Sequence, residues 1–92
     1  MIRMFVRHPV QDFDTWKQGY DGFNAERRTM GVLEERIFTA PDNTCDVTFT
    51  HDFETLEQAQ RFAASARLGE VMEQAGVVGP ATVWFTTPTA SS

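Results

Sequence analysis

The order in which strand-like and helical patterns follow one another is the feature that most limits the folds open to this chain. Along its 92 residues the patterns run strand, helix, strand, strand, helix, strand. The expected strands are residues 2–10, 32–39, 46–53 and 81–86, and the expected helices are residues 12–30 and 55–76. Right-handed crossovers between these elements predict an α+β fold, a ferredoxin-like βαββαβ plait. Its four-stranded antiparallel sheet has the order 4-1-3-2 and carries both helices on one face.

Local signals support the individual elements. Residues 46–53 alternate, so that the apolar and histidine side chains at the odd-numbered positions share one face of a strand. Residues 40–43 contain Pro, Asp and Asn and predict a turn that joins the second and third strands through a long loop. Thr55, followed by Gln58 three residues later, matches a capping box and predicts the start of the second helix. Ser65 predicts a break within that helix.

Length and aromatic content together predict a single domain that pairs with a second copy. We expect one domain over residues 1–87 and a flexible tail over residues 88–92. The chain contains 8 Phe and 2 Trp, more large rings than a thin two-layer core of this size readily buries. Because both helices are expected on one face, the other sheet face would leave aromatic side chains in water. Two sheets packed back to back across a twofold axis would cover them, which predicts a homodimer.

The sequence also resembles a known family. The resemblance lies in residues 7–10, 12–17, 20–21, 62–68 and 72–77, with Ala66 where relatives often have Pro. These segments are similar to the small dimeric α+β-barrel proteins of the antibiotic-biosynthesis-monooxygenase-like superfamily. The resemblance implies a dimeric α+β barrel. The family includes cofactor-free oxygenases acting on activated aromatics, polyketide cyclases, muconolactone-type isomerases and haem-degrading enzymes.

The two histidines are the candidate catalytic residues. His8 ends the first expected strand and His51 lies near the end of the third. We expect these strands to be parallel neighbours whose carboxyl ends coincide, so that both rings could lie close together at one pocket mouth. A pair of imidazoles could supply a base and an acid, or a base and an oxyanion donor, near neutral pH. The competing interpretation is structural: His51 as a packed side chain bonded to backbone, and His8 as part of a strand exit before Pro9.

An aromatic stripe on the first helix supplies the candidate substrate-binding residues. Trp16, Tyr20 and Phe23 fall at helical spacing and could line a pocket for an aromatic ligand between this helix and the sheet. The competing interpretation is that the stripe is ordinary core. On the opposite sheet face we expect Asp52 to pair with Arg7 across strands.

Other classes of site and partner are not indicated by the sequence. The formal net charge of −5 disfavours nucleic acid, and no apolar run approaches the roughly 20 residues of a membrane span. Cys45 is the single cysteine, so no internal disulfide forms. We find no spacing typical of a metal site or a phosphate-binding loop, and expect no metal and no cofactor. A cytoplasmic protein is expected.

Two functions remain open on these grounds. The first is a small cofactor-free enzyme of the monooxygenase, cyclase or isomerase type, acting on an activated aromatic or polyketide-like molecule in an apolar pocket. In it His51 would be the base and His8 its partner. The second is a non-catalytic homodimer that binds a small molecule or has a structural role. An enclosed cavity lined by polar and aromatic groups would favour the first.

Overall fold

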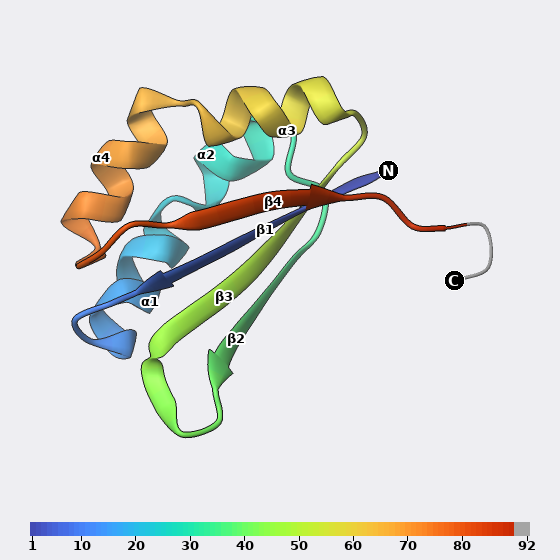
Figure 1. Cartoon of the computed structure of the whole chain (residues 1–92). Helices are drawn as coiled ribbons and strands as arrows, with labels where there is room; N and C mark the ends of the chain where they lie inside the picture. The colour runs from blue at the N-terminus through green and yellow to red at the C-terminus, as the bar shows by residue number, and fades with distance from the viewer. Residues whose placement is uncertain (90–92) are drawn as a thin grey trace.

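The computed structural model describes residues 1–89 and contains four strands and four helical segments in that range (Figure 1). The last three residues of the predicted tail lie outside the described residues. The strands are β1 (Ile2–Pro9), β2 (Glu35–Ala40), β3 (Asn43–Phe53) and β4 (Thr82–Thr86), and the helices are α1 (Phe13–Gly22), α2 (Asn24–Thr29), α3 (Leu56–Ala63) and α4 (Ala66–Gln74). None of these helices is long and apolar enough to cross a membrane.

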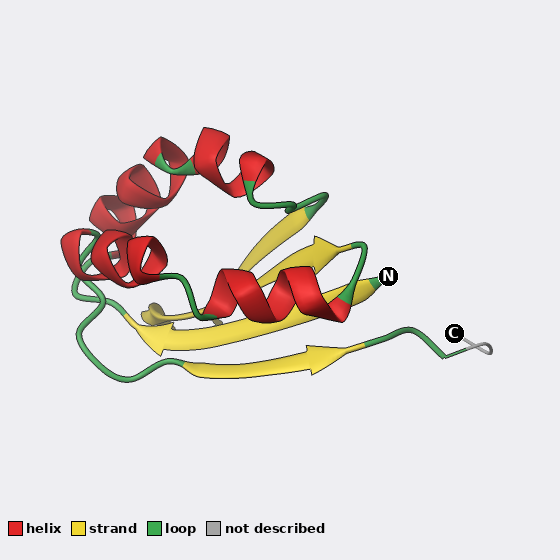
Figure 2. Ribbon diagram, turned by 90° about the horizontal axis from the view of Figure 1, so that it is seen from above, coloured by secondary structure: helices red, strands yellow, loops and turns green. Residues whose placement is uncertain are grey.

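The sheet confirms the predicted plait and corrects one feature of it. The strand order is β2-β3-β1-β4, and every neighbouring pair is antiparallel. All four helical segments cover one face of the sheet, as Figure 2 shows from above. The expectation that β1 and β3 are parallel neighbours is wrong. In a βαββαβ plait each crossover joins two strands that have an antiparallel strand between them, so β1 and β3 run in opposite directions.

The second helical region is broken where the sequence predicts. Thr55 accepts a hydrogen bond from the Gln58 N–H, and the Gln58 side chain accepts one from the Thr55 N–H, which completes the capping box of α3. Ser65 accepts a hydrogen bond from the Leu68 N–H and caps α4. The chain leaves α4 through Gly76, whose φ of +86° favours glycine.

The first helical region is also broken, which the sequence analysis did not predict. Instead of one helix over residues 12–30, α1 ends at Gly22 and α2 begins at Asn24. Phe23 lies between them with φ −91° and ψ 2°, and its N–H bonds to Tyr20 and Asp21 carbonyls. Phe23 is buried at this break, and the Arg67 guanidinium of α4 lies over its ring.

The turn between β2 and β3 is shorter than the sequence predicts. The β2–β3 hairpin turns through Pro41 and Asp42 alone, because β3 already begins at Asn43, so the loop is short rather than long.

On the face away from the helices, Asp52 pairs with Arg3 at 2.7 Å, not with Arg7. The antiparallel register sets Asp52 directly opposite Arg3, and Arg7 bonds to Asp46 instead.

The core lies between the helices and the sheet. Alternate residues of β1 and β3 point into it and meet the aromatic stripe of α1 and the apolar faces of α3 and α4. The opposite face carries a stacked pair, Phe5 and Trp84, with ring centroids 5.1 Å apart. Phe38 lies on the same face and is half exposed, as Trp84 is. The sheet therefore leaves large aromatic surface uncovered by this chain.

Candidate active site

A small cavity lies between the sheet and the helices. Its volume is about 20 Å³, room for roughly one water molecule. The lining is mostly aromatic and apolar with a few polar groups: His8, Trp16, Tyr20, Phe23, Arg27, Phe49, His51, Leu68, Val71, Met72 and Ala75. All five residues singled out from the sequence, namely His8, His51, Trp16, Tyr20 and Phe23, contribute to this lining.

The structure places both histidines on the same face of the sheet, but not as the sequence analysis expected. His8 lies opposite Val47 and His51 opposite Met4, so the two rings are at different heights along the antiparallel pair. Phe49 separates them, with its ring centroid 5.5 Å from His8 and 4.9 Å from His51. The carboxyl ends of β1 and β3 do not coincide. The shared cavity, rather than a shared strand end, brings the histidines together.

His8 is a buried imidazole in an aromatic surrounding. Its ring meets those of Trp16 and Phe49 edge-on. Within residues 1–89 neither of its ring nitrogens has a hydrogen-bond partner, although the side chain is only 1% exposed. Burial lowers the pKa of His8 below its ordinary value, so the ring is neutral at pH 7.

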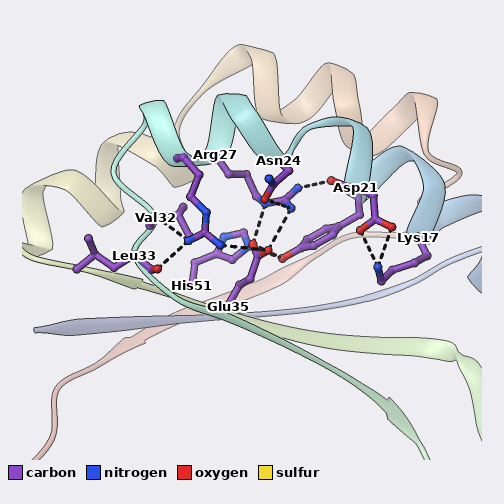
Figure 3. A network of polar contacts seen from close by, with 10 residues as sticks. Lys17, Asp21, Asn24, Arg27, Val32, Leu33, Glu35 and His51 are labelled. Carbon is purple, nitrogen blue, oxygen red and sulfur yellow. Dashed lines mark hydrogen bonds and ion pairs between the residues drawn. The ribbon is translucent and has the colours of Figure 1, made fainter.

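His51 belongs to a polar network that also contains side chains from α1, α2 and β2 (Figure 3). Its Nε2 lies 2.9 Å from the Tyr20 hydroxyl, and that hydroxyl donates to Glu35 Oε2, also at 2.9 Å. Glu35 stands directly opposite His51 in the β2–β3 register. The other imidazole nitrogen, Nδ1, has no partner in the described part of the chain.

Arg27 anchors this network from α2. Its guanidinium donates to both Glu35 oxygens, at 2.9 and 3.3 Å, and to the Tyr20 carbonyl oxygen. The guanidinium carbon also lies 3.7 Å from the centre of the Tyr20 ring. The Arg27 side chain is only 2% exposed. An arginine so deeply buried is stable only because each of these contacts offsets its lost hydration.

Burial and charge set the protonation states of the network. Burial lowers the pKa of His51 to about 4, and the charge on Arg27 acts in the same direction. Burial alone would raise the pKa of Glu35, but hydrogen bonds from Arg27 and Tyr20 outweigh it and hold that pKa below its ordinary value. Burial raises the pKa of Tyr20. At neutral pH the network is thus a neutral imidazole, a neutral phenol, a carboxylate and a guanidinium.

Helix α4 forms the outer wall of the cavity with partly buried side chains. None of its own residues, Ala66–Gln74, is fully buried. Arg67 bonds to both Glu26 oxygens at 3.0 Å and ties α4 to α2. At the far end Gly19 lets Ala75 approach α1, since a Cβ on Gly19 would stand 2.8 Å from that of Ala75. Between these ends Leu68 and Val71 are partly buried and pack against the core, so side-chain packing holds the wall as well.

Sequence reasoning found the rings of this site but missed Glu35 and did not give Arg27 a role. Arg27 continues the helical spacing of Trp16, Tyr20 and Phe23, which was a usable signal that it points inward. Glu35 carries no such signal, because its place depends on the hairpin register. Among residues 1–89 no group of three or more His, Cys, Asp or Glu is placed to hold a metal ion.

Comparison with solved structures places this architecture among known folds. A proposed antibiotic biosynthesis monooxygenase from Bordetella bronchiseptica superposes with a TM-score of 0.81 at 16% identity, covering 96% of each chain. The chain has the fold of the antibiotic biosynthesis monooxygenases. A monooxygenase from the gene ActVA-Orf6 of Streptomyces coelicolor, solved with nanaomycin D, gives a TM-score of 0.70 at 22% identity over 97% of this chain and 88% of that one.

A third relative of the monooxygenase fold is SnoaB of Streptomyces nogalater, described as a cofactor-independent oxygenase. It gives a TM-score of 0.73 at 9% identity, covering 99% of this chain and 97% of that one. No family model and no curated protein sequence matches the chain. At 9–22% identity, these similarities show a shared fold and nothing beyond it.

Proposed function

We propose that the chain is a small cofactor-free enzyme of the monooxygenase, cyclase or isomerase type. Its substrate would be an activated aromatic or polyketide-like molecule with an acidic proton. His51 would remove that proton, leaving an anion delocalised over the ring system, and His8 would donate to the oxygen on which charge develops. Such an anion reacts further without a bound cofactor, by rearrangement or, in a monooxygenase, with dioxygen as co-reactant.

The observation that carries this proposal is the set of buried imidazole nitrogens at one cavity. Three of the four, both of His8 and Nδ1 of His51, have no hydrogen-bond partner in residues 1–89. A buried polar atom without a partner destabilises a fold by about 1–3 kcal/mol, so such atoms persist where function requires them. A ligand carrying an acidic proton and a carbonyl or hydroxyl oxygen would satisfy them. Trp16, Tyr20 and Phe23 would provide its aromatic contacts.

Two relatives of the same fold support the reaction class. SnoaB is described as a cofactor-independent oxygenase, and the ActVA-Orf6 monooxygenase was solved with nanaomycin D bound. A substrate of comparable size needs more room than about 20 Å³. The outer wall, α4, is the element whose displacement would enlarge the cavity, because no residue between its two attached ends is fully buried.

Replacement of His51 by glutamine should lower the catalysed rate of proton abstraction by about a hundredfold, the lower end of the range for general-base catalysis. The effect is placed at the lower end because a base whose pKa is about 4 is weak. The readout is exchange of the acidic CH₂ protons of anthrone for deuterium, followed by NMR without dioxygen.

A non-catalytic homodimer is the second candidate, and the small volume of the cavity favours it. If α4 does not move, about 20 Å³ accepts a water molecule but no aromatic ring. The histidines would then serve packing alone. The same exchange measurement separates the two candidates. If His51 only packs, the His51→Gln variant exchanges the protons at the same rate as the wild type.

We propose, for either function, that the open sheet face pairs with a second copy of the chain. Its exposed aromatic side chains are the Phe5–Trp84 stack on β1 and β4 and Phe38 on the opposite edge strand β2. The Arg3–Asp52 and Arg7–Asp46 pairs join the central strands β1 and β3 of this face and leave no unpaired charge in either pair. Two such faces are self-complementary across a twofold axis.

The dimer is tested by Trp84→Glu, which places a charge among the exposed aromatic side chains of the proposed interface. We expect size-exclusion chromatography with light scattering to give a dimer for the wild type and a monomer for this variant. Val78→Glu is the matched control, because Val78 is more exposed than Trp84 but lies outside the sheet, in the loop before β4. A monomeric wild type, or a Trp84→Glu dimer of unchanged affinity, would contradict the proposed interface.

A further inference from the structure

We infer that Arg27 and Glu35 are positioning residues that fix the proton order of the site, so that neutral His51 carries its proton on Nε2 and keeps Nδ1 as an unprotonated base. The inference rests on the proposed function only for the use of that base. The proton order itself follows from the contacts made by one oxygen atom, the hydroxyl oxygen of Tyr20.

That oxygen has two partners but only one proton to give. It lies 2.9 Å from Glu35 Oε2 and 2.9 Å from His51 Nε2. A carboxylate only accepts hydrogen bonds, so the contact with Glu35 requires the phenol proton. The contact with His51 then requires a proton from the imidazole. His51 must therefore donate through Nε2.

Glu35 accepts without donating only while it is ionised, and Arg27 keeps it ionised. The guanidinium donates to both carboxylate oxygens and is itself buried. A second arginine, Arg28, stands 3.7 Å from Oε1. A protonated Glu35 would leave the Arg27 charge uncompensated in the interior, which is strongly unfavourable. The direction of donation is thus His51 to Tyr20, Tyr20 to Glu35, and Arg27 to Glu35.

Donation through Nε2 determines the state of the other ring nitrogen of His51, Nδ1. A neutral imidazole has one protonated and one unprotonated nitrogen, so donation through Nε2 leaves the lone pair on Nδ1. Nδ1 is the His51 nitrogen that has no partner among the described residues. Arg27 and Glu35 therefore act through Tyr20, without touching a substrate, to hold the one tautomer of His51 whose free nitrogen can accept a proton.

Nitrogen NMR on the whole protein measures this directly. With ¹⁵N-labelled histidine, long-range ¹H–¹⁵N spectra at pH 7 show which ring nitrogen is unprotonated. The chain has two histidines, so His8→Gln assigns the signals. We expect the unprotonated nitrogen of His51 to be Nδ1. Finding it to be Nε2 would overturn the inference without any variant.

Variants test whether Arg27 and Glu35 cause the order. In the double variant Arg27→Met with Glu35→Met the phenol loses its acceptor, so Tyr20 should donate to Nε2 and the imidazole proton should move to Nδ1. Glu35→Gln is the conservative variant and should keep the wild-type order, because an amide oxygen can still accept from Tyr20. Glu57→Gln, which removes an exposed carboxylate that pairs with Arg61 away from the cavity, should leave the tautomer unchanged.

The outcomes separate this inference from the proposed function. A His51 tautomer that stays the same in the double variant overturns the positioning role. Should that variant not fold, Arg27→Leu with Glu35→Leu replaces it, because it also removes the carboxylate that lies 3.9 Å from Nε2; an unchanged preference for a proton on Nε2 would likewise overturn the role. If the tautomer behaves as expected while His51→Gln exchanges anthrone protons at the wild-type rate, the proton order stands and the proposed function fails.

Discussion

Replacing Arg27 by methionine should destabilise the protein by about 3 kcal/mol, the lower end of the range for removing one partner of a buried ion pair. Glu35 would lose two hydrogen bonds and its balancing charge while it remains four-fifths buried. The lower end applies because Arg28 stands nearby and part of the carboxylate reaches solvent. Urea unfolding at one fixed protein concentration measures the free-energy change.

Two controls make that result specific. Arg61→Met removes an exposed arginine from a surface pair with Glu57 and should change the unfolding free energy by less than about 0.5 kcal/mol. The double variant Arg27→Met with Glu35→Met should lose less unfolding free energy than the two single variants lose together. The difference should be about 1 kcal/mol or more, since no charge of the pair is left unpaired. Strict additivity would show that the two residues do not stabilise each other.

Acidification from pH 6.5 to pH 4 should remove about 3 kcal/mol of stability through His51 alone. The folded pKa of about 4 lies below the unfolded value of 6.5, so between these values the unfolded chain binds a proton that the folded chain does not. Stability is therefore fully present above pH 6.5 and falls as the pH drops, by 1.36 kcal/mol per unit. The groups that set the folded value after burial are Arg27, Glu35, Arg28 and Asp52.

The matched variant for this prediction is His51→Gln, which has no group to titrate at position 51. Its unfolding free energy should depend much less on pH over the same interval, although His8 leaves a smaller slope of the same sign. Glu35 and Asp46 have lowered pKa values and contribute their loss at still lower pH. Equal slopes for wild type and variant would mean that His51 is not buried as a neutral ring.

The fold was largely predictable because its signals are local. The alternation in residues 46–53 correctly assigned His51 to the core face, and the hydroxyl caps at Thr55 and Ser65 correctly gave the starts of α3 and α4. The order of the elements then left the ferredoxin-like plait as the expected topology. Each of these inferences depends on residues within a few positions of one another.

The site was harder to predict because it depends on contacts between distant segments. The direction of β1 relative to β3 decides where His8 and His51 lie, and treating the strands as parallel gave the wrong answer. The pairing of Glu35 with His51 depends on a register shift between Thr39 and Ala40, next to the short turn at Pro41 and Asp42, where a longer loop was expected. A shift of one residue in that hairpin would send Glu35 to the other face.

The most direct test of the account is the rate at which the wild-type protein exchanges the CH₂ protons of anthrone with deuterium in the absence of dioxygen. Excluding dioxygen isolates the removal of the proton from any later step. We expect saturable acceleration by the wild type, a rate about a hundredfold lower in His51→Gln, and a wild-type rate in Glu57→Gln, which changes an exposed carboxylate away from the cavity. Equal rates in the wild type and His51→Gln would contradict it and leave the non-catalytic dimer as the better description.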